Sequence, residues 1–455
     1  MKIGFIAMSG VRAHNEELTQ LGLTLPGFVD RNRIIASMPS LSLLTLAGLT
    51  PRRFDIEYRE IADLNPTGLP EDYDLVAIST FTAQLKEAYK VAEFYRSKNI
   101  PVVMGGLPVT SLPIEAKQYC TSVVIGEGEP LWPQVLADFE RGALQPFYSS
   151  TPAGLYDLRE APMPRFDLLA PDKYNRITVQ TSRGCPHKCE FCASSILLTS
   201  KYKLKPVEKV IAEIHEIKKI WPRPFIEFAD DNSFVHREHY KALLRELAKE
   251  NLRWFTEADV RVADDEELLG LMRDSGCQQI LIGLESPTRV SLDGIETNTN
   301  WKARQQDGYK AAIAKIQSYG VTVNGCFILG LDGDKPDVFD NVLDFVRDSE
   351  LYEVQVTFMT AFPGTPLHRR LKAEGRILRD GAWELCTLFD INFTPRGMSV
   401  AELQSGFLSL VKQLYSADET ATRRRRFKTM LRTSPNFGRR AARRAVREEM
   451  MPLAA

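Results

Sequence analysis

The chain has 455 residues, of which 44% are hydrophobic and 26% are charged, and its formal net charge is -1. This length is too great for one hydrophobic core and predicts two or three domains. The balanced charge gives no electrostatic reason to expect nucleic acid as a partner, and no run of about 18 apolar residues predicts a membrane-spanning helix. The N-terminal MKIGFIAMSGVRAHNEE favours a first strand over a signal peptide, so we expect a cytoplasmic protein.

Strand-like and helix-like segments alternate over residues 1–145. Apolar or alternating runs predict strands at 2–8, 54–61, 73–80, 100–106 and 122–129, and helices at 42–51 and 82–98. This alternation predicts a parallel, doubly wound α/β sheet of the Rossmann-like class. Such sheets bind ligands beyond the carboxyl ends of their strands.

Loops rich in Gly, Ser and Thr follow four of these strands, and such residues let a ligand approach the backbone closely. The loops are Ser9–Arg12, Ser79–Thr82, Gly105–Thr110 and Gly126–Glu129. Ordinary strand-to-helix turns have a similar composition, so the loops alone leave both a ligand site and a structural turn open.

A proline-rich stretch with little periodicity, residues 146–172, predicts a linker. Beyond it, strands are expected within 176–182, 225–231, 253–260, 279–286, 321–331 and 353–362. Because helical segments separate them, they predict a full or partial (β/α)6 barrel over 173–371, with its site at the C-terminal ends of the strands. A helical segment over 372–420 and a basic tail over 421–455 follow. The tail is either a solvated, partly disordered extension or a basic helix that contacts anionic lipid or RNA.

The most specific pattern is TSRGCPHKCEFCAS, which contains Cys185, Cys189 and Cys192. An odd total of seven cysteines argues against a disulfide framework, and the other four are expected to be buried apolar side chains. Structural zinc needs four ligands, which leaves His187 as a strained fourth candidate. Iron–sulfur clusters also bind thiolates, and three cysteines would leave one iron of a [4Fe-4S] cluster open to another ligand.

The C-x3-C-x2-C spacing after the first barrel strand, with Phe191 before the last cysteine, resembles the radical S-adenosylmethionine (SAM) enzymes. The resemblance implies that the three cysteines hold three irons, while the amino and carboxylate groups of SAM chelate the fourth. An electron from a flavodoxin- or ferredoxin-type donor would then cleave SAM to a 5'-deoxyadenosyl radical that abstracts hydrogen from an unactivated position. The implied SAM contacts are Phe191, Asp230, Asp231, Glu285 and Ser286, with Asn232 and Thr256 as further candidates.

Several candidates have a structural alternative. Adjacent side chains on a strand face opposite ways, so one of Asp230 and Asp231 is expected at the ligand and the other at a helix cap. Glu257 and Arg261 either contact the ligand or form a surface salt bridge. Four aromatic residues either line an apolar cavity or belong to the core, namely Phe358, Phe362, Trp383 and Phe389.

The segments PSLSLLTLAGLTP, VVMGGLPVT and VVIGEGEP resemble the cobalamin-binding domain that is fused to many radical SAM enzymes. The segment NFTPRGMSVAELQSGFLSLVKQLYS resembles the C-terminal extension of a bacterial subgroup that includes methylases of hopanoid lipids and natural products. The implied cobalamin contacts are Ser9, Gly10, Val11, Ser79, Thr80, Gly105, Gly106, Thr110, Gly126 and Glu127. Many cobalamin proteins carry a D-x-H-x-x-G motif whose His binds cobalt. In residues 1–145 the only histidine is His14, in VRAHNEE, which does not match this motif, so no cobalt ligand is predicted.

These resemblances predict a cobalamin-dependent methylation of an unactivated carbon in a lipid or natural product. The alternatives are a cobalamin-linked radical cyclase or rearrangement enzyme without methyl transfer, and a non-enzymatic cobalamin-binding sensor. A methylthiotransferase is disfavoured because that class uses extra N-terminal cysteines, and only Cys120 is present there. The basic tail would suit peripheral contact with a membrane.

Overall fold

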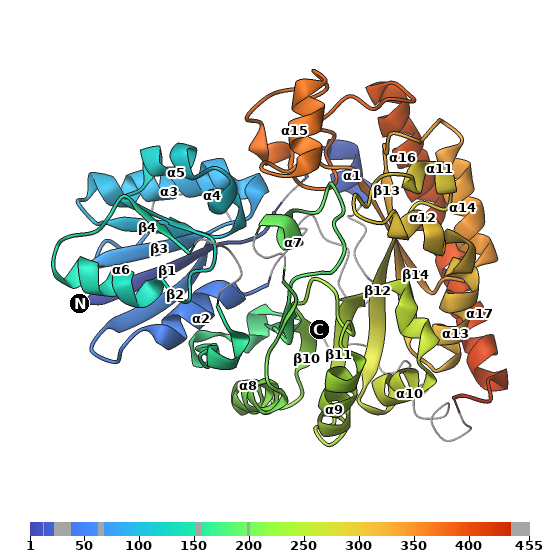
Figure 1. Ribbon diagram of the computed structural model, residues 1–455, viewed down its shortest axis with the longest axis horizontal. Helices are drawn as coiled ribbons and strands as arrows, with labels where there is room; N and C mark the ends of the chain where they lie inside the picture. The colour runs from blue at the N-terminus through green and yellow to red at the C-terminus, as the bar shows by residue number, and fades with distance from the viewer. Residues whose placement is uncertain (12, 22–37, 62–67, 151–155, 198–200, 438–455) are drawn as a thin grey trace.

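The computed structural model describes residues 1–11, 13–21, 38–61, 68–150, 156–197 and 201–437 (Figure 1). Within these ranges the strands form two parallel six-stranded sheets and one short antiparallel pair. None of the helices in the same ranges is long and apolar enough to cross a membrane.

The first sheet has the strand order β2-β1-β3-β4-β5-β6, which confirms the predicted doubly wound fold. Its strands are β1 (Lys2–Met8), β2 (Asp55–Ile61), β3 (Leu75–Ser79), β4 (Val102–Gly105), β5 (Ser122–Ile125) and β6 (Phe147–Ser149). The edge strand β6 lies in the stretch expected to be a linker, and it pairs in parallel with β5. Strand order reverses beside β1 and β3, so a crevice for a ligand is expected where their carboxyl ends diverge.

Helices cover both faces of this sheet (Figure 1). One apolar cluster joins it to α2 and α6, and another joins it to α3, α4 and α5. The bounds are α1 (Glu16–Leu21), α2 (Leu41–Leu49), α3 (Leu85–Ser97), α4 (Leu107–Ser111), α5 (Pro113–Tyr119) and α6 (Trp132–Glu140). Helix α1 differs, because its Leu18 packs into the core of the second domain.

The second sheet has the order β14-β13-β12-β11-β10-β7, and its end strands do not pair with each other, so the barrel is partial. All six predicted strands are present: β7 (Ile177–Val179), β10 (Phe225–Phe228), β11 (Arg253–Ala258), β12 (Cys277–Glu285), β13 (Thr322–Leu329) and β14 (Glu353–Phe358). The main helices on its outer face are α8 (Val207–Ile220), α9 (Arg237–Leu247), α10 (Glu266–Asp274), α13 (Tyr309–Ser318) and α14 (Val338–Asp348).

Short elements complete the barrel region. The antiparallel pair β8 (Ser182–Arg183) and β9 (Lys203–Leu204) flanks the cysteine loop, which also contains α7 (Ala193–Leu197). Two further short helices are α11 (Arg289–Leu292) and α12 (Trp301–Gln305). The 3-10 helices are η1 (Thr82–Gln84), η2 (Leu158–Glu160), η3 (Phe166–Leu168), η4 (Pro171–Lys173), η5 (Val260–Asp264), η6 (Gln306–Gly308) and η7 (Trp383–Leu385).

The C-terminal section contains α15 (Pro366–Ala373), α16 (Val400–Leu414) and α17 (Ala417–Thr433). Helix α17 belongs to the stretch expected to be a basic tail, yet its Arg423 is only 2% exposed and donates to the Leu414 carbonyl. Arg424 donates to the carboxylate of Glu353 on β14 at 2.7 Å. The expectation of a solvated, partly disordered extension is therefore wrong for residues 421–433, while 438–455 lie outside the described residues.

The aromatic residues of this section belong to the core. Phe358 is 1% exposed and its ring centroid lies 4.0 Å from that of Phe407 on α16. Trp383 donates its indole N–H to Glu115 on α5, so η7 is fastened to the first domain. Phe389 is also buried and Phe362 packs partly buried beside the first domain, which favours the core alternative for the buried members.

Candidate active site

The cysteine loop begins at the carboxyl end of β7, where Asp230 anchors it to the neighbouring strand β10. The carboxylate of Asp230 accepts the backbone N–H groups of Thr181 and Ser182 at 2.7 and 2.8 Å. It also accepts the hydroxyls of Thr181, Ser233 and Tyr240. Burial raises the pKa of Asp230, and these donors oppose that shift. Asp230 thus fixes the direction in which the chain enters the loop.

Asp231 and Asn232 contact the loop directly. Asp231 accepts the Gly184 N–H at 2.6 Å and the Ser194 hydroxyl, so one carboxylate holds both ends of the cysteine triplet. Asn232 donates its side-chain N–H toward Cys185 Sγ at 3.7 Å. The three consecutive residues therefore support the loop in different ways, and contact with SAM stays a prediction for both aspartates.

The three thiols are reduced, and their surroundings suit an iron–sulfur cluster. Burial raises the pKa of Cys185 to about 11, while N–H groups of His187 and Asn232 favour the thiolate. Burial also raises the pKa of Cys189. Iron would compensate the desolvated thiolates, and N–H donors to sulfur are a usual feature of such sites. The residues present therefore fit the cluster that the motif implies.

The far side of the loop is held by the segment after α11. Glu296 is 2% exposed and accepts the backbone N–H groups of Lys188 at 3.2 Å and Trp301 at 3.1 Å. The Glu190 N–H donates to the Ile295 carbonyl at 2.9 Å. Although burial opposes it, these N–H groups lower the pKa of Glu296 to about 2. Its charge consequently stabilises the loop.

The contacts of His187 argue against its being a zinc ligand. Its Nε2 lies 3.3 Å from Asp259 Oδ2, and its ring stacks on Trp301 with centroids 4.2 Å apart. Arg261 donates to Asp259 and lies over the same tryptophan ring. Despite burial, His187 and Arg261 hold the pKa of Asp259 well below its usual range.

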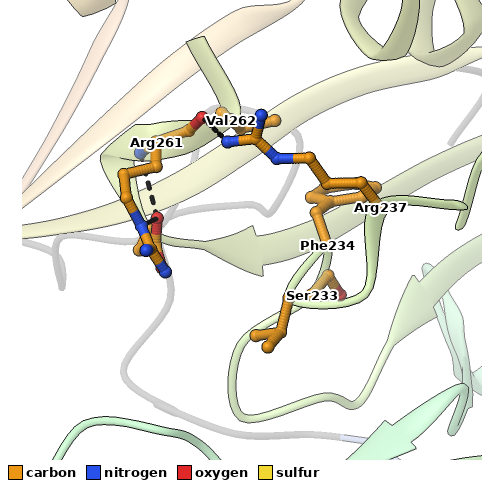
Figure 2. A pocket seen from close by; sticks show the side chains of 7 residues that line it. Ser233, Phe234, Arg237, Arg261 and Val262 are labelled. Atoms are coloured by element: carbon orange, nitrogen blue, oxygen red, sulfur yellow. Dashed lines mark hydrogen bonds and ion pairs between the residues drawn. The ribbon is translucent and has the colours of Figure 1, made fainter. Parts of the chain in front are cut away.

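A pocket of about 210 Å³ opens beside this network (Figure 2). Figure 2 shows the guanidinium of Arg237 reaching the Arg261 carbonyl, with Ser233 and Phe234 along one side. Its volume lies below the roughly 300 Å³ at which sites for small-molecule ligands usually begin. No residue of the cysteine loop lines this pocket. Arg261 lines it, which argues against a contact between Arg261 and a ligand in the barrel interior.

Glu285 occupies an unusual position at the end of β12. Its φ of 63° is left-handed, and the ladder between β12 and β13 shifts register there. Lys302 Nζ donates to Glu285 Oε1 at 2.8 Å and to the Gly283 carbonyl at 2.5 Å. Although burial opposes it, the charge of Glu285 raises the pKa of Lys302. Such backbone conformations concentrate at functional sites, and the next residue, Ser286, is 1% exposed.

An ion-pair network that no sequence pattern predicted joins the first domain to the cysteine loop. Arg183, two residues before Cys185, donates to Glu127 at 2.8 Å and to Glu129 at 2.6 Å. Lys203 on β9 also donates to Glu127 at 2.7 Å. The acidic loop after β5 therefore lies directly against the entrance to the cysteine loop, and the Glu127 carboxylate is already paired.

The other predicted cobalamin contacts gather at the carboxyl edge of the first sheet. They end or follow β1, β3, β4 and β5, namely Ser9, Gly10, Val11, Ser79, Thr80, Gly105, Gly106, Thr110 and Gly126. Thr110 accepts the Gly126 N–H at 3.0 Å, which ties two of the loops together. Arg12 lies outside the described residues, and His14 is exposed with its backbone N–H on Asp390. Contact with cobalamin stays a prediction for all of them.

Comparison with known proteins gives a family for this arrangement. Residues 179–346 match the model of the radical SAM superfamily. The chain therefore contains a radical SAM domain. Such a domain implies a [4Fe-4S] cluster and SAM as cofactors, in agreement with the thiols on the loop after β7. Residues 365–454 match a domain of unknown function (DUF4070).

Curated relatives and solved structures extend the likeness over both domains. A bacteriochlorophyllide d C-12(1)-methyltransferase from Chlorobaculum tepidum is 26% identical, covering 83% of each chain. A hopanoid C-2 methylase from Rhodopseudomonas palustris is 26% identical over 76% of this chain and 67% of its own. The radical SAM methyltransferase TsrM from Kitasatospora setae, solved with cobalamin and a [4Fe-4S] cluster, superposes with a TM-score of 0.64 at 15% identity. That superposition covers 92% of this chain and 89% of TsrM.

Proposed function

We propose that the protein is a cobalamin-dependent radical SAM methyltransferase that methylates an unactivated carbon of a lipid or natural product. The observation that carries this proposal is the Arg183 network, which brings the loop after β5 against the cysteine loop. A methyl carrier and a radical source must both reach one substrate carbon. Two cofactor sites joined at their edges would meet that need.

The proposed division of labour follows the domains. Residues 1–145 would hold cobalamin and residues 173–371 the cluster and SAM. Residues 146–172 would be a linker from which β6 joins the first sheet, 372–420 a helical domain, and 421–455 a tail that includes most of α17. When bound, the cluster supplies the electron for SAM cleavage, and cobalamin carries the methyl group. Asp230, Asp231 and Glu296 hold the loop in place, while Glu285 with Lys302 presents a carboxylate for the ribose of SAM.

The names of the relatives support methylation as the outcome. Two are methyltransferases for bacteriochlorophyllides and one is a hopanoid methylase. The aligned structure solved with cobalamin supports the cofactor assignment for the first domain. A flavodoxin- or ferredoxin-type electron donor, and peripheral membrane contact by the tail, remain part of the proposal.

The test begins with the purified chain under anaerobic conditions. After reconstitution with iron, sulfide and hydroxocobalamin, the visible spectrum of the washed protein should contain both cofactors. Dithionite and SAM should then yield 5'-deoxyadenosine and S-adenosylhomocysteine (SAH). Cys192→Ala should abolish both products, whereas Cys120→Ala, in the core of the first domain, should retain them. Failure of the wild type to form either product would contradict the proposal, and cobalamin retention without either product would support the sensor.

A radical cyclase without methyl transfer is a second candidate. One relative, 24% identical over 66% of this chain and 58% of its own, is the anaerobic magnesium-protoporphyrin IX monomethyl ester cyclase of Rubrivivax gelatinosus. Methyl transfer from SAM leaves SAH, and hydrogen abstraction alone leaves 5'-deoxyadenosine. Formation of 5'-deoxyadenosine without SAH in the same assay would favour the cyclase.

A further inference from the structure

Glu257 stands on β11 and faces the interior of the barrel. It pairs in register with Leu281 on β12, which pairs in turn with Asn324 on β13, so the three side chains share one face of the sheet. The flanking Thr256 and Ala258 face the helices and are 0% and 8% exposed, whereas Glu257 is exposed. Solvent therefore reaches the interior side of the sheet at Glu257, although it does not reach Asn324 in the same row.

The surroundings of Glu257 are acidic. Burial and, after it, the charges of Glu227, Asp231 and Glu285 together raise the pKa of Glu257 to about 8. A side chain that solvent reaches, but that protein atoms desolvate, lies deep in a concave site. At neutral pH such a carboxyl is mostly protonated.

Cations pair with two of its acidic neighbours but not with Glu257 itself. Arg176 pairs with Glu227, and Lys302 pairs with Glu285 at 2.8 Å. Among the described residues, the carboxylate of Glu257 has no hydrogen-bond or ion-pair partner. An unpaired carboxylate among others is stabilised by a positive charge, so the electrostatics favour a cationic ligand.

A second observation also indicates a ligand at this face. Asn324 is 0% exposed, and both polar atoms of its side chain are without a partner in the described protein. Gln279, which pairs with Phe255 on the same face, is 3% exposed and its Oε1 is likewise unpartnered. Burying a polar group without a partner costs about 1–3 kcal/mol. Bound ligand or water is expected to satisfy these atoms.

We propose that Glu257 is the counter-charge for the positive sulfur of bound SAM. The inference rests on the proposed function, because it takes SAM as the ligand of the barrel. We favour the sulfonium of SAM over its ammonium group as the partner of Glu257, because the amino group is expected to bind the cluster iron. Glu257 lies within electrostatic range of Asp231 and Glu285, which are both predicted SAM contacts.

The proposal predicts how binding depends on pH. The charged and titratable groups around Glu257 are Glu227, Asp230, Asp231, Glu285, Lys302 and Cys326. A cation favours the ionised carboxylate, so SAM binding near pH 7 should release a proton from Glu257 and strengthen as pH rises toward 8.5. The α-amino group of SAM titrates near 8 as well. SAH has the same amino group and no positive sulfur, so the ratio of the two affinities isolates the sulfonium.

The experiment measures SAM and SAH binding by calorimetry on the full chain with an oxidised, reconstituted cluster and no reductant. In Glu257→Gln, the ratio of SAM to SAH affinity should fall about tenfold, and the extra proton released with SAM should disappear. Glu238→Gln on α9, whose side chain is 86% exposed, is the matched control and should leave both unchanged.

An unchanged ratio in Glu257→Gln, or an equal loss of both ligands, would overturn the inference while leaving the proposed function intact. A wild-type chain that loads its cluster but binds neither SAM nor SAH would contradict the proposed function instead. If Glu257→Gln fails to fold or to load a cluster, the pH dependence of binding to the wild-type chain still tests the inference. A ratio of SAM to SAH affinity that rises between pH 7 and 8.5 supports the inference, and a ratio that stays constant overturns it.

Discussion

Removing the charge of Arg183 tests whether the two domains are joined as the structure indicates. Its side chain is 15% exposed and pairs with Glu127, whose side chain is 1% exposed, and with Glu129, which is 11% exposed. In Arg183→Gln both carboxylates stay desolvated, although Lys203 still reaches Glu127. Breaking a buried ion pair by deleting one partner typically costs 3–5 kcal/mol. Because Lys203 compensates in part, we expect a loss of about 3 kcal/mol in the free energy of unfolding.

Urea denaturation of the folded chain, followed by circular dichroism, measures this loss. Arg159→Gln is the matched control, because Arg159 also forms a short pair, with Asp157, but its side chain is 77% exposed. Exposed pairs contribute about 0–1 kcal/mol, so the control should change little. Adding Glu129→Gln alone to the Arg183 variant should recover part of the loss, because Glu127 still pairs with Lys203 and no unpaired carboxylate remains. If Arg183→Gln costs no more than Arg159→Gln, the network does not join the domains.

Three further outcomes follow from single side chains. Gly126 has a φ of 86°, and a Cβ there would lie 2.5 Å from Ser150 Oγ, so Gly126→Ala should lower thermal stability more than Gly142→Ala, where φ is 66° and the space is open. Glu296 has a lowered pKa of about 2, so its stabilisation is complete above about pH 4.5 and lost as pH falls toward 2. In Glu296→Gln, the free energy of unfolding should therefore depend less on pH within that window than it does in the wild type. Glu353 is 1% exposed, and Glu353→Gln should cost about 2–4 kcal/mol in urea denaturation by leaving arginines of α17 without a counter-charge.

The sequence predicted the long strands because their apolar runs extend over several residues. The strands that it missed, β6, β8 and β9, have two or three residues each, which is too short for a hydrophobic period to appear. Their pairing depends on partners elsewhere in the chain, as between Ser182 and Leu204. The cysteine triplet was recognisable because its ligands are close in sequence and their spacing is fixed by the cluster.

Charged residues were predicted less well, because a charge in a sequence does not reveal its partner. The arginines of α17 suggested an exposed basic surface, yet Arg424 meets Glu353, which lies 71 residues away. Arg183 meets Glu127 over a separation of 56 residues, in a loop that its glycines suggested was a ligand site. Asp230 was predicted as a candidate SAM contact, but its carboxylate accepts backbone N–H groups of Thr181 and Ser182, and no sequence pattern could reveal those contacts.

The pairing of charges divides the acidic residues of the site by role. Carboxylates that meet a cation or several N–H groups, such as Glu285 and Glu296, already have their charge balanced by the protein and suit a structural role or a neutral ligand group such as a hydroxyl. Glu257 has no such partner among the described residues, and burial together with the neighbouring carboxylates raises its pKa. A site that retains an unpaired carboxylate is destabilised when empty and regains free energy from a positive ligand. The same imbalance would disfavour SAH after methyl transfer, because the positive sulfur is then gone, and would assist its release.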